Sequence, residues 1–451
     1  MESCPGRLRV STVDTLSRLS IRQILGFSLG RRAGAQPHPV PCKTGSDEAP
    51  VCWASMSSRS VRTVLPLALV TCTSMLAMDL FLPALPALQR GLDITVAQGQ
   101  WAVALFLAGL AGSQLLWGEA LDRFGPRKCV GAGIVVLVVS SIACALAGDL
   151  TELLAMRLLQ GVAAGASTVV APSVIRATLP DADAMKGIAS IAMIEAVVPA
   201  AAPVAGAAML LVADWRATFW VVGGLALVAL PFVLRVTPQQ LPGLEPATRT
   251  GYRALLRDGR YRRIAASHAL CFGALITFVA SGPQMLANAL GLGPSAFAAA
   301  QVVGVTTFIV VASQAGRIGK RIGAPGAVTL GARLHLLLCS GFLLLVQLGL
   351  VGFATLLVFW SLFCGVLAVR GPAAFSEALA VPPAQMGRAS ALLVLALLAA
   401  GAAGTQIAAP FLDRVGLPAV IAVMTVMTGL SLLSVTPYPA TGLANPPAME
   451  S

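Results

Sequence analysis

The chain has 451 residues, of which 57% are hydrophobic and only 11% are charged, and its mean hydropathy is +0.83. A soluble protein of this length could not cover so much apolar surface, so the composition excludes an ordinary soluble enzyme. The formal net charge of +12 would suit a nucleic-acid-binding protein. The placement of the basic residues, described below, argues against that class.

Apolar runs of about 20 residues or more alternate with short polar gaps, and such runs are long enough to cross a bilayer as helices. They lack the alternation of polar and apolar residues that is typical of membrane strands. We therefore predict an all-α integral membrane protein with about twelve transmembrane helices. The runs lie at roughly 62–82, 99–119, 128–148, 152–174, 187–211, 215–235, 264–284, 297–317, 325–349, 353–377, 387–410 and 416–436.

The segments outside these runs suggest a domain organisation. Residues 1–55 contain no run long enough to span, and we expect either a disordered cytoplasmic leader or a mispredicted extension before an initiator Met56. A six-helix half at 56–235, a basic linker at 236–263, a second half at 264–440 and a tail at 441–451 follow. The Arg-rich stretch 253–263 is expected to anchor the inner face, or to lie as an amphipathic helix against anionic headgroups.

Basic residues are concentrated in alternate gaps. One set of gaps, with the N-terminal flank and the linker, carries 18 Lys and Arg residues, whereas the other set carries only Arg90, Arg216 and Arg414. Cytoplasmic loops of membrane proteins hold such an excess of basic residues. The asymmetry predicts a multi-pass protein of the cell inner (plasma) membrane with both termini in the cytoplasm.

An eight-residue spacing of glycines and charges occurs twice, in two gaps between apolar runs that are 198 residues apart. A repeat of this length in an apolar sequence indicates two fused, pseudo-symmetric membrane halves, which usually form a transporter with its site between them. The first copy consists of Gly118, Asp122, Arg123 and Gly125, and the second of Gly316, Lys320, Arg321 and Gly323.

The first copy, extended to Arg127 and Lys128, resembles the loop motif between helices 2 and 3 of the major facilitator superfamily. Two further stretches are similar to other motifs of that superfamily: the Arg-containing motif of helix 4 (Arg157, Gln160, Gly161, Gly165) and the Pro/Gly motif of antiporters in helix 5 (Pro199, Pro203, Gly206). The segments 79–86 and 215–220 resemble its bicyclomycin/chloramphenicol-resistance subgroup.

The resemblance implies the twelve-helix fold of that superfamily, with transport by alternating access. It also implies that the 118–128 motif, with Asp122 and Arg127, gates the change between states. Gly161 and Gly165 are spaced to let two helices pack closely.

Ionisable residues inside a bilayer cost about 2.5–3.5 kcal/mol or more, so each is a functional candidate. By helix rise, Asp79 and Arg157 both lie about 25 Å from the inner surface and could pair. Glu195 lies near the midplane without a basic neighbour in sequence, which suits a group that binds and releases a proton. The proton-coupling candidates are Asp79 and Glu195, and the cavity charge candidates are Arg157, Arg333 and Arg370.

These observations favour a proton-coupled exporter of small, largely apolar compounds. A proton symporter that imports a metabolite and a non-transporting membrane sensor or scaffold remain the alternatives. The sequence contains no Walker loop and no metal-binding spacing of Cys or His, so neither cofactor nor metal is expected. The expected partners are a small-molecule substrate, protons and the lipid bilayer, with no nucleic acid, and the protein is expected to be monomeric.

Overall fold

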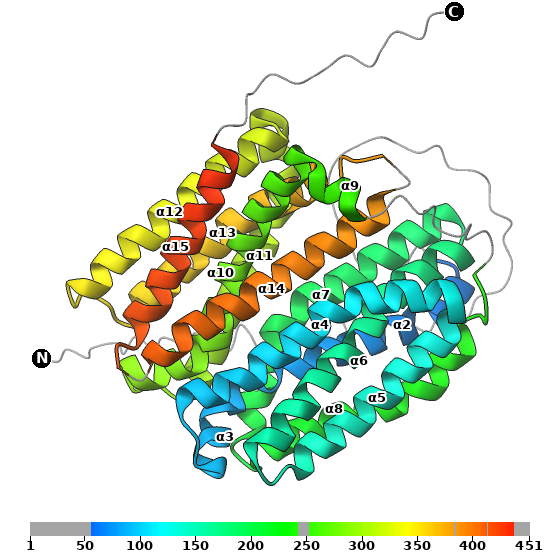
Figure 1. The fold of residues 1–451 in the computed structure, drawn as a ribbon, viewed down its shortest axis with the longest axis horizontal. Helices are drawn as coiled ribbons and strands as arrows, with labels where there is room; N and C mark the ends of the chain where they lie inside the picture. The colour runs from blue at the N-terminus through cyan, green and yellow to red at the C-terminus, as the bar shows by residue number, and fades with distance from the viewer. Residues whose placement is uncertain (1–55, 242–251, 383–384, 413, 437–451) are drawn as a thin grey trace, which may run out of the picture. The chain divides into compact units, whose positions relative to one another are not determined.

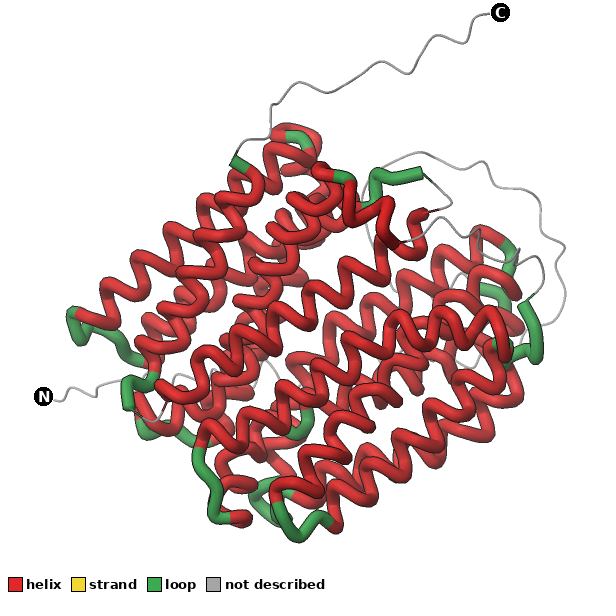
Figure 2. Tube along the Cα trace, viewed as in Figure 1, coloured by secondary structure: helices red, strands yellow, loops and turns green. Residues whose placement is uncertain are grey.

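Helices form all the spanning segments of this computed structural model, which describes residues 56–241, 252–382, 385–412 and 414–436 (Figures 1 and 2). A bilayer core offers no water to backbone N–H and C=O groups, so each spanning segment must satisfy them internally. Twelve helices within the described ranges are long and apolar enough to cross a membrane. The predicted fold class is confirmed. The predicted leader at 1–55 and tail at 441–451 lie outside the described residues.

The helices of the first half match the first six predicted runs. The structure extends most of them by several residues at their polar ends, where caps satisfy the terminal amides. Thr95, for example, begins the second span with a capping box to Gln98. The elements are α2 (Ser58–Asp79), the 3-10 turn η2 (Leu82–Ala84), α3 (Leu85–Leu92), α4 (Val96–Phe124), α5 (Pro126–Leu146), α6 (Leu150–Thr178), α7 (Asp181–Met209) and α8 (Arg216–Val236).

The second half repeats this arrangement after a short additional helix in the linker. That helix, α9, buries Leu255 against α14 and leaves Arg253, Leu256 and Arg257 exposed. The elements are α9 (Tyr252–Arg257), α10 (Gly259–Leu290), α11 (Pro294–Ile322), α12 (Ala324–Gln347), α13 (Phe353–Ala378), α14 (Met386–Leu412) and α15 (Leu417–Val435).

Successive spans run in opposite directions, so the connections lie alternately at two ends of the bundle. We call the end that carries the 124–126 and 322–324 turns the motif end. The opposite end, which carries the 93–95 and 291–293 turns, is called the far end. At the motif end, the Ser60 hydroxyl donates a hydrogen bond of 2.5 Å to the Asp183 carboxylate, which ties the start of α2 to the start of α7.

The two repeated gaps fold into the same turn. Gly125 joins α4 to α5 with φ 79° and ψ 163°, and Gly323 joins α11 to α12 with φ 69° and ψ 162°. Only glycine adopts this region readily. At Gly125 a Cβ would also overlap the backbone carbonyl of Gln239, whereas at Gly118 and Gly316 it would meet nothing within 4 Å. The last glycine of each motif copy is therefore the one that the turn requires.

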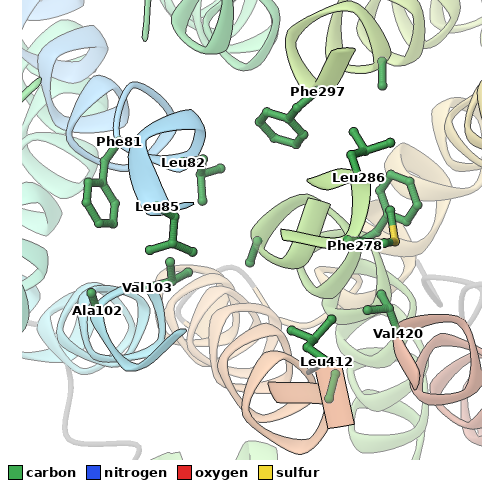
Figure 3. Packing of buried hydrophobic residues seen from close by; sticks show 14 of the residues in the cluster. Phe81, Leu82, Leu85, Ala102, Val103, Phe278, Leu286, Phe297, Leu412 and Val420 are labelled. Carbon is green, nitrogen blue, oxygen red and sulfur yellow. The ribbon is translucent and has the colours of Figure 1, made fainter. Parts of the chain in front are cut away.

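Apolar packing joins the two halves near the far end (Figure 3). Buried residues of η2, α3 and α4, such as Leu82, Leu85 and Val103, belong to one cluster with Phe278 of α10 and Leu412 of α14. Within the second half the ring of Phe278 stacks on that of Trp360, with their centroids 4.1 Å apart.

Polar side chains lie within the same junction. The Gln100 side-chain amide of α4 donates to the Ala280 carbonyl of α10 across 3.4 Å. The Oε1 atoms of Gln100 and of Gln301 on α11 are buried and have no hydrogen-bond partner within the described part of the protein.

We predict that Gly125→Ala destabilises the protein, because a side chain at this backbone conformation costs roughly 1–3 kcal/mol. Gly118→Ala is the matched control, since it adds a methyl group in open space and removes a glycine from a helix interior. Thermal unfolding of both purified variants checks this: the apparent melting temperature should fall for Gly125→Ala and hold or rise for Gly118→Ala. Equal melting temperatures would contradict the prediction.

Candidate functional site

A cavity of about 230 Å³, which we call the central cavity, lies between the two halves. Asp79 is the only ionisable group among the described residues that line it. Apolar side chains supply most of the surface, and Ser74, Thr168 and Gln301 add neutral polar groups. The lining residues are Ser74, Met75, Met78, Asp79, Phe106, Leu107, Leu110, Ala164, Thr168, Pro199, Phe272, Leu275, Ile276, Val279, Gln301 and Leu398.

Asp79 is the last residue of α2, and the end of that helix positions it. Leu80 closes the helix, and the chain passes into η2 at Leu82. The carbonyl of Ala77 lies among the last four of α2, which have no partner within a helix. Arg157 of α6 supplies that partner, because its Nη1 donates to the Ala77 carbonyl across 2.9 Å. The guanidinium therefore caps the helix that presents Asp79.

Arg157 is completely buried and joins five elements of the first half. Its Nε donates to the Ala102 carbonyl of α4 across 3.0 Å, and its Nη1 donates to Gln160 Oε1 across 2.6 Å. Gln160 in turn donates to the Ser141 hydroxyl of α5. The rings of Phe81, Phe106 and Phe219 surround the guanidinium, with their centroids 4.6, 4.5 and 5.7 Å from its central carbon.

These contacts differ from the pairing that depth along the helices suggested. No ion pair joins Asp79 to Arg157 within the described ranges. Backbone carbonyls and aromatic faces stabilise the guanidinium, and the carboxylate lines the central cavity instead. Arg157 thus acts on the cavity through the helix end that it caps.

Close glycine contacts bring α6 against α4. A Cβ at Gly161 would overlap the Phe106 carbonyl, and one at Gly165 would overlap the Ser113 hydroxyl. The predicted close packing at this spacing is confirmed. It lets Phe106 reach both Arg157 and the central cavity.

Glu195 lies one helical turn before Pro199 on α7. Pro199 lines the central cavity, whereas Glu195 is half-buried and does not belong to its lining. Because a proline has no N–H, Pro199 leaves the Glu195 carbonyl without its usual helical partner. Further along, Pro203 and Gly206 are buried, and a Cβ at Gly206 would overlap the Leu80 carbonyl, so α7 and the end of α2 are in backbone contact there.

The two remaining cavity charge candidates lie elsewhere in the second half. Arg370 of α13 is completely buried, and its Nη2 donates to the Ser267 carbonyl and to the hydroxyls of Ser267 and Ser431. It connects α13 to α10 and α15, much as Arg157 connects helices of the first half. Arg333 is exposed on α12 and belongs to neither the central cavity nor the far-end cavity described below.

At the motif end, charged residues of the two halves approach each other. Asp122 of α4 interacts electrostatically with Arg388 of α14, and Arg388 also lies over the ring of Tyr252, 5.9 Å from its centroid. Burial raises the pKa of the Tyr252 phenol, against the opposing effect of Arg388. Among the residues that the structure describes, Arg123 pairs with Glu119 of its own helix, at 4.0 Å and in an exposed position. Arg127 is exposed, as are Gly316, Lys320, Arg321 and Gly323 of the second copy.

A second cavity, which we call the far-end cavity, has a volume of about 1000 Å³. The ends of η2, α3, α7 and α10 line it together with the start of α11. Small apolar residues dominate the lining, and Arg90 and Asp214 are its ionisable members among the described residues.

Sequence reasoning missed several residues of the central cavity. Met75 lies three residues before Met78 and four before Asp79 on α2, and spacings of three and four residues place side chains on one helix face. Once Asp79 was chosen as a candidate, the two methionines could therefore have been predicted to line the same cavity. Phe272 and Gln301 of the second half carry no comparable signal, because only the packing of the two halves brings them to the cavity.

Comparisons with known proteins agree with this architecture. The family model of the Major Facilitator Superfamily matches residues 67–405. The multidrug resistance protein MdtL of Escherichia coli O157:H7 and that of Shigella dysenteriae serotype 1 are each 31% identical over 216 residues, 47% of this chain. That alignment spans 55% of each relative, so the chain matches little more than half of their length.

Solved structures show the same fold. A D-xylose–proton symporter superposes with a TM-score of 0.68 at 15% identity, over 84% of this chain and 97% of its own. A bacterial homologue of the human lysosomal transporter Spinster, inward-facing and unoccupied, gives 0.62 at 14% identity, over 84% and 94%. The family match, the twelve spanning helices and the cavity between two halves lead to one conclusion: this multi-pass membrane protein belongs to the Major Facilitator Superfamily of transporters.

Proposed function

We propose that this transporter exports small, largely apolar compounds from the cytoplasm in exchange for protons. The observation that carries the proposal is the central cavity, which combines a mostly apolar surface with the single carboxyl group of Asp79. An apolar surface favours compounds that partition out of water. A lone carboxyl group can hold either a proton or a positively charged substrate at one site. The MdtL relatives, whose names describe multidrug resistance, support the direction of transport.

We assign the proton to Asp79 rather than to Glu195. Both lie within spanning helices, where an unpaired charge is costly and a neutral acid is tolerable. Asp79 is in the lining of the cavity, so that proton and substrate would compete for the same space. Glu195 lies one turn outside it and would have to act at a distance.

The basic residues support an orientation with the motif end in the cytoplasm. On this assignment, the central cavity takes up substrate from the cytoplasmic side and the far-end cavity faces the opposite side of the membrane. The attraction between Asp122 and Arg388 crosses from one half to the other, so it would stabilise the state in which the motif ends of α4 and α14 are close. Breaking it would be part of the change between states.

Replacing Asp79 by Asn tests the proton site. Asn preserves the shape of the side chain but cannot titrate, so we expect proton-driven transport to be lost while folding is kept. The measurement is movement of ethidium, a lipophilic cation, across vesicles that hold the purified protein under an imposed pH gradient. Export is shown by ethidium moving against the proton flow. Movement of ethidium with the protons would instead indicate symport.

Glu195→Gln is the matched control, because it neutralises the other carboxyl group that lies near the midplane. We expect this variant to keep most of the proton-driven transport. Full coupling in Asp79→Asn together with loss of coupling in Glu195→Gln would reassign the proton to Glu195. Coupling retained in both variants would contradict proton exchange at either residue.

A second prediction concerns the contact at the motif end. Asp122→Asn should slow turnover roughly two- to fivefold, because the attraction of Arg388 for the exposed Asp122 contributes at most about 1 kcal/mol. Its substrate affinity should stay unchanged, since Asp122 is remote from the central cavity. Transport rate and equilibrium dye binding are measured for each variant.

Glu119→Gln serves as the control for Asp122→Asn. It removes a carboxylate from the same helix, but the ion pair of Glu119 with Arg123 does not cross between the halves. Its turnover should equal that of the unmodified protein. A large change in the substrate affinity of Asp122→Asn, at normal turnover, would rule out a role in the switch between states.

A further inference from the structure

The far-end cavity is not explained by a transport site at Asp79 alone. Its volume of about 1000 Å³ is more than four times the 230 Å³ of the central cavity. Pockets that bury a drug-sized molecule have volumes of about 300–1000 Å³. In this conformation the far-end cavity therefore has room for such a molecule, and the central cavity does not.

The two cavities adjoin along the same helices. From α2 to η2 the lining passes from Asp79 of the central cavity to Pro83 of the far-end cavity, and on α10 it passes from Val279 to Pro283. On α11 the consecutive residues Gln301 and Val302 line different cavities. A compound that leaves the central cavity towards the far end would enter the far-end cavity next.

Little chain separates the linings of the two cavities. Along α2 and η2 they are four residues apart, from Asp79 to Pro83, and along α10 they are four residues apart, from Val279 to Pro283. Four residues make about one helical turn. Within the first interval a Cβ at Gly206 of α7 would overlap the Leu80 carbonyl.

The chemistry of the far-end cavity indicates what it would hold. Its lining is apolar apart from a few groups, and its one acidic and one basic residue, Asp214 and Arg90, give it no net charge. Asp214 is also paired with Arg216 at 3.5 Å. The cavity therefore suits small, largely apolar molecules.

From this arrangement we infer that the far-end cavity is a second binding site for the transported compounds, occupied after they leave the central cavity. The order of occupation rests on the proposed export function. Binding itself does not, because the cavity is present in the resting protein and can be tested without a gradient.

Tryptophan substitutions that fill the cavity test this inference. Ala208 of α7 and Ala299 of α11 are exposed and belong to two different helices that line the cavity, so Ala208→Trp and Ala299→Trp should occupy space there without disturbing the core. Ala205→Trp is the matched control, since Ala205 is an exposed alanine one turn earlier on α7 and lines neither cavity. The probe is ethidium, and its equilibrium binding to the full-length protein in lipid nanodiscs is measured by fluorescence anisotropy.

We expect each of the two cavity-filling variants to raise the Kd for ethidium at least tenfold and the Ala205→Trp control to leave it unchanged. Binding unaffected by both filling substitutions, or no ethidium binding to the unmodified protein, would overturn the inference. Failure of transport with this binding pattern intact would contradict the export function and still support the second site.

Discussion

The burial of one guanidinium group organises the first half of this transporter. Arg157 is a cation with no exposed surface, and isolating a charge from water is far more costly than any single contact can offset. The surrounding elements therefore have to supply acceptors and aromatic faces from several directions at once. That demand fixes where α2 ends, how closely α4 approaches α6, and hence the position of Asp79. Removing the arginine would leave these acceptors unpaired, and replacing it by lysine would satisfy only part of them.

The sequence was sufficient for the features that depend on composition and spacing. Each of the twelve predicted apolar runs is a helix in the described part of the chain, because helix formation is obligatory where the backbone has no access to water. The turn glycines Gly125 and Gly323 were also readable, since their repetition 198 residues apart reports a shared backbone requirement. Close packing at Gly161 followed from its spacing to Gly165.

Features that depend on three-dimensional packing could not be predicted from the sequence. Depth along the helices placed Asp79 and Arg157 at one level, which suggested an ion pair, but depth does not specify which face of a helix a residue occupies. The Arg157 guanidinium donates its hydrogen bonds to backbone carbonyls, and the sequence does not show which carbonyls are available as acceptors. The lining of the central cavity could not be predicted for the same reason, because residues such as Phe272 and Leu398 reach it only through the packing of the second half against the first.

The junction between the halves near the far end has a property that an apolar interface would lack. Gln100 and Gln301 bury polar atoms there that have no partner among the described residues. Each such atom costs about 1–3 kcal/mol while it is kept from water, and that cost disappears when water reaches it. Separation of the halves exposes apolar surface, which is unfavourable, but it also hydrates these two amide oxygens. Hydrophobic contact thus stabilises the closed junction, and the unsatisfied polar atoms limit that stabilisation. Such a balance is what reversible opening in every transport cycle requires.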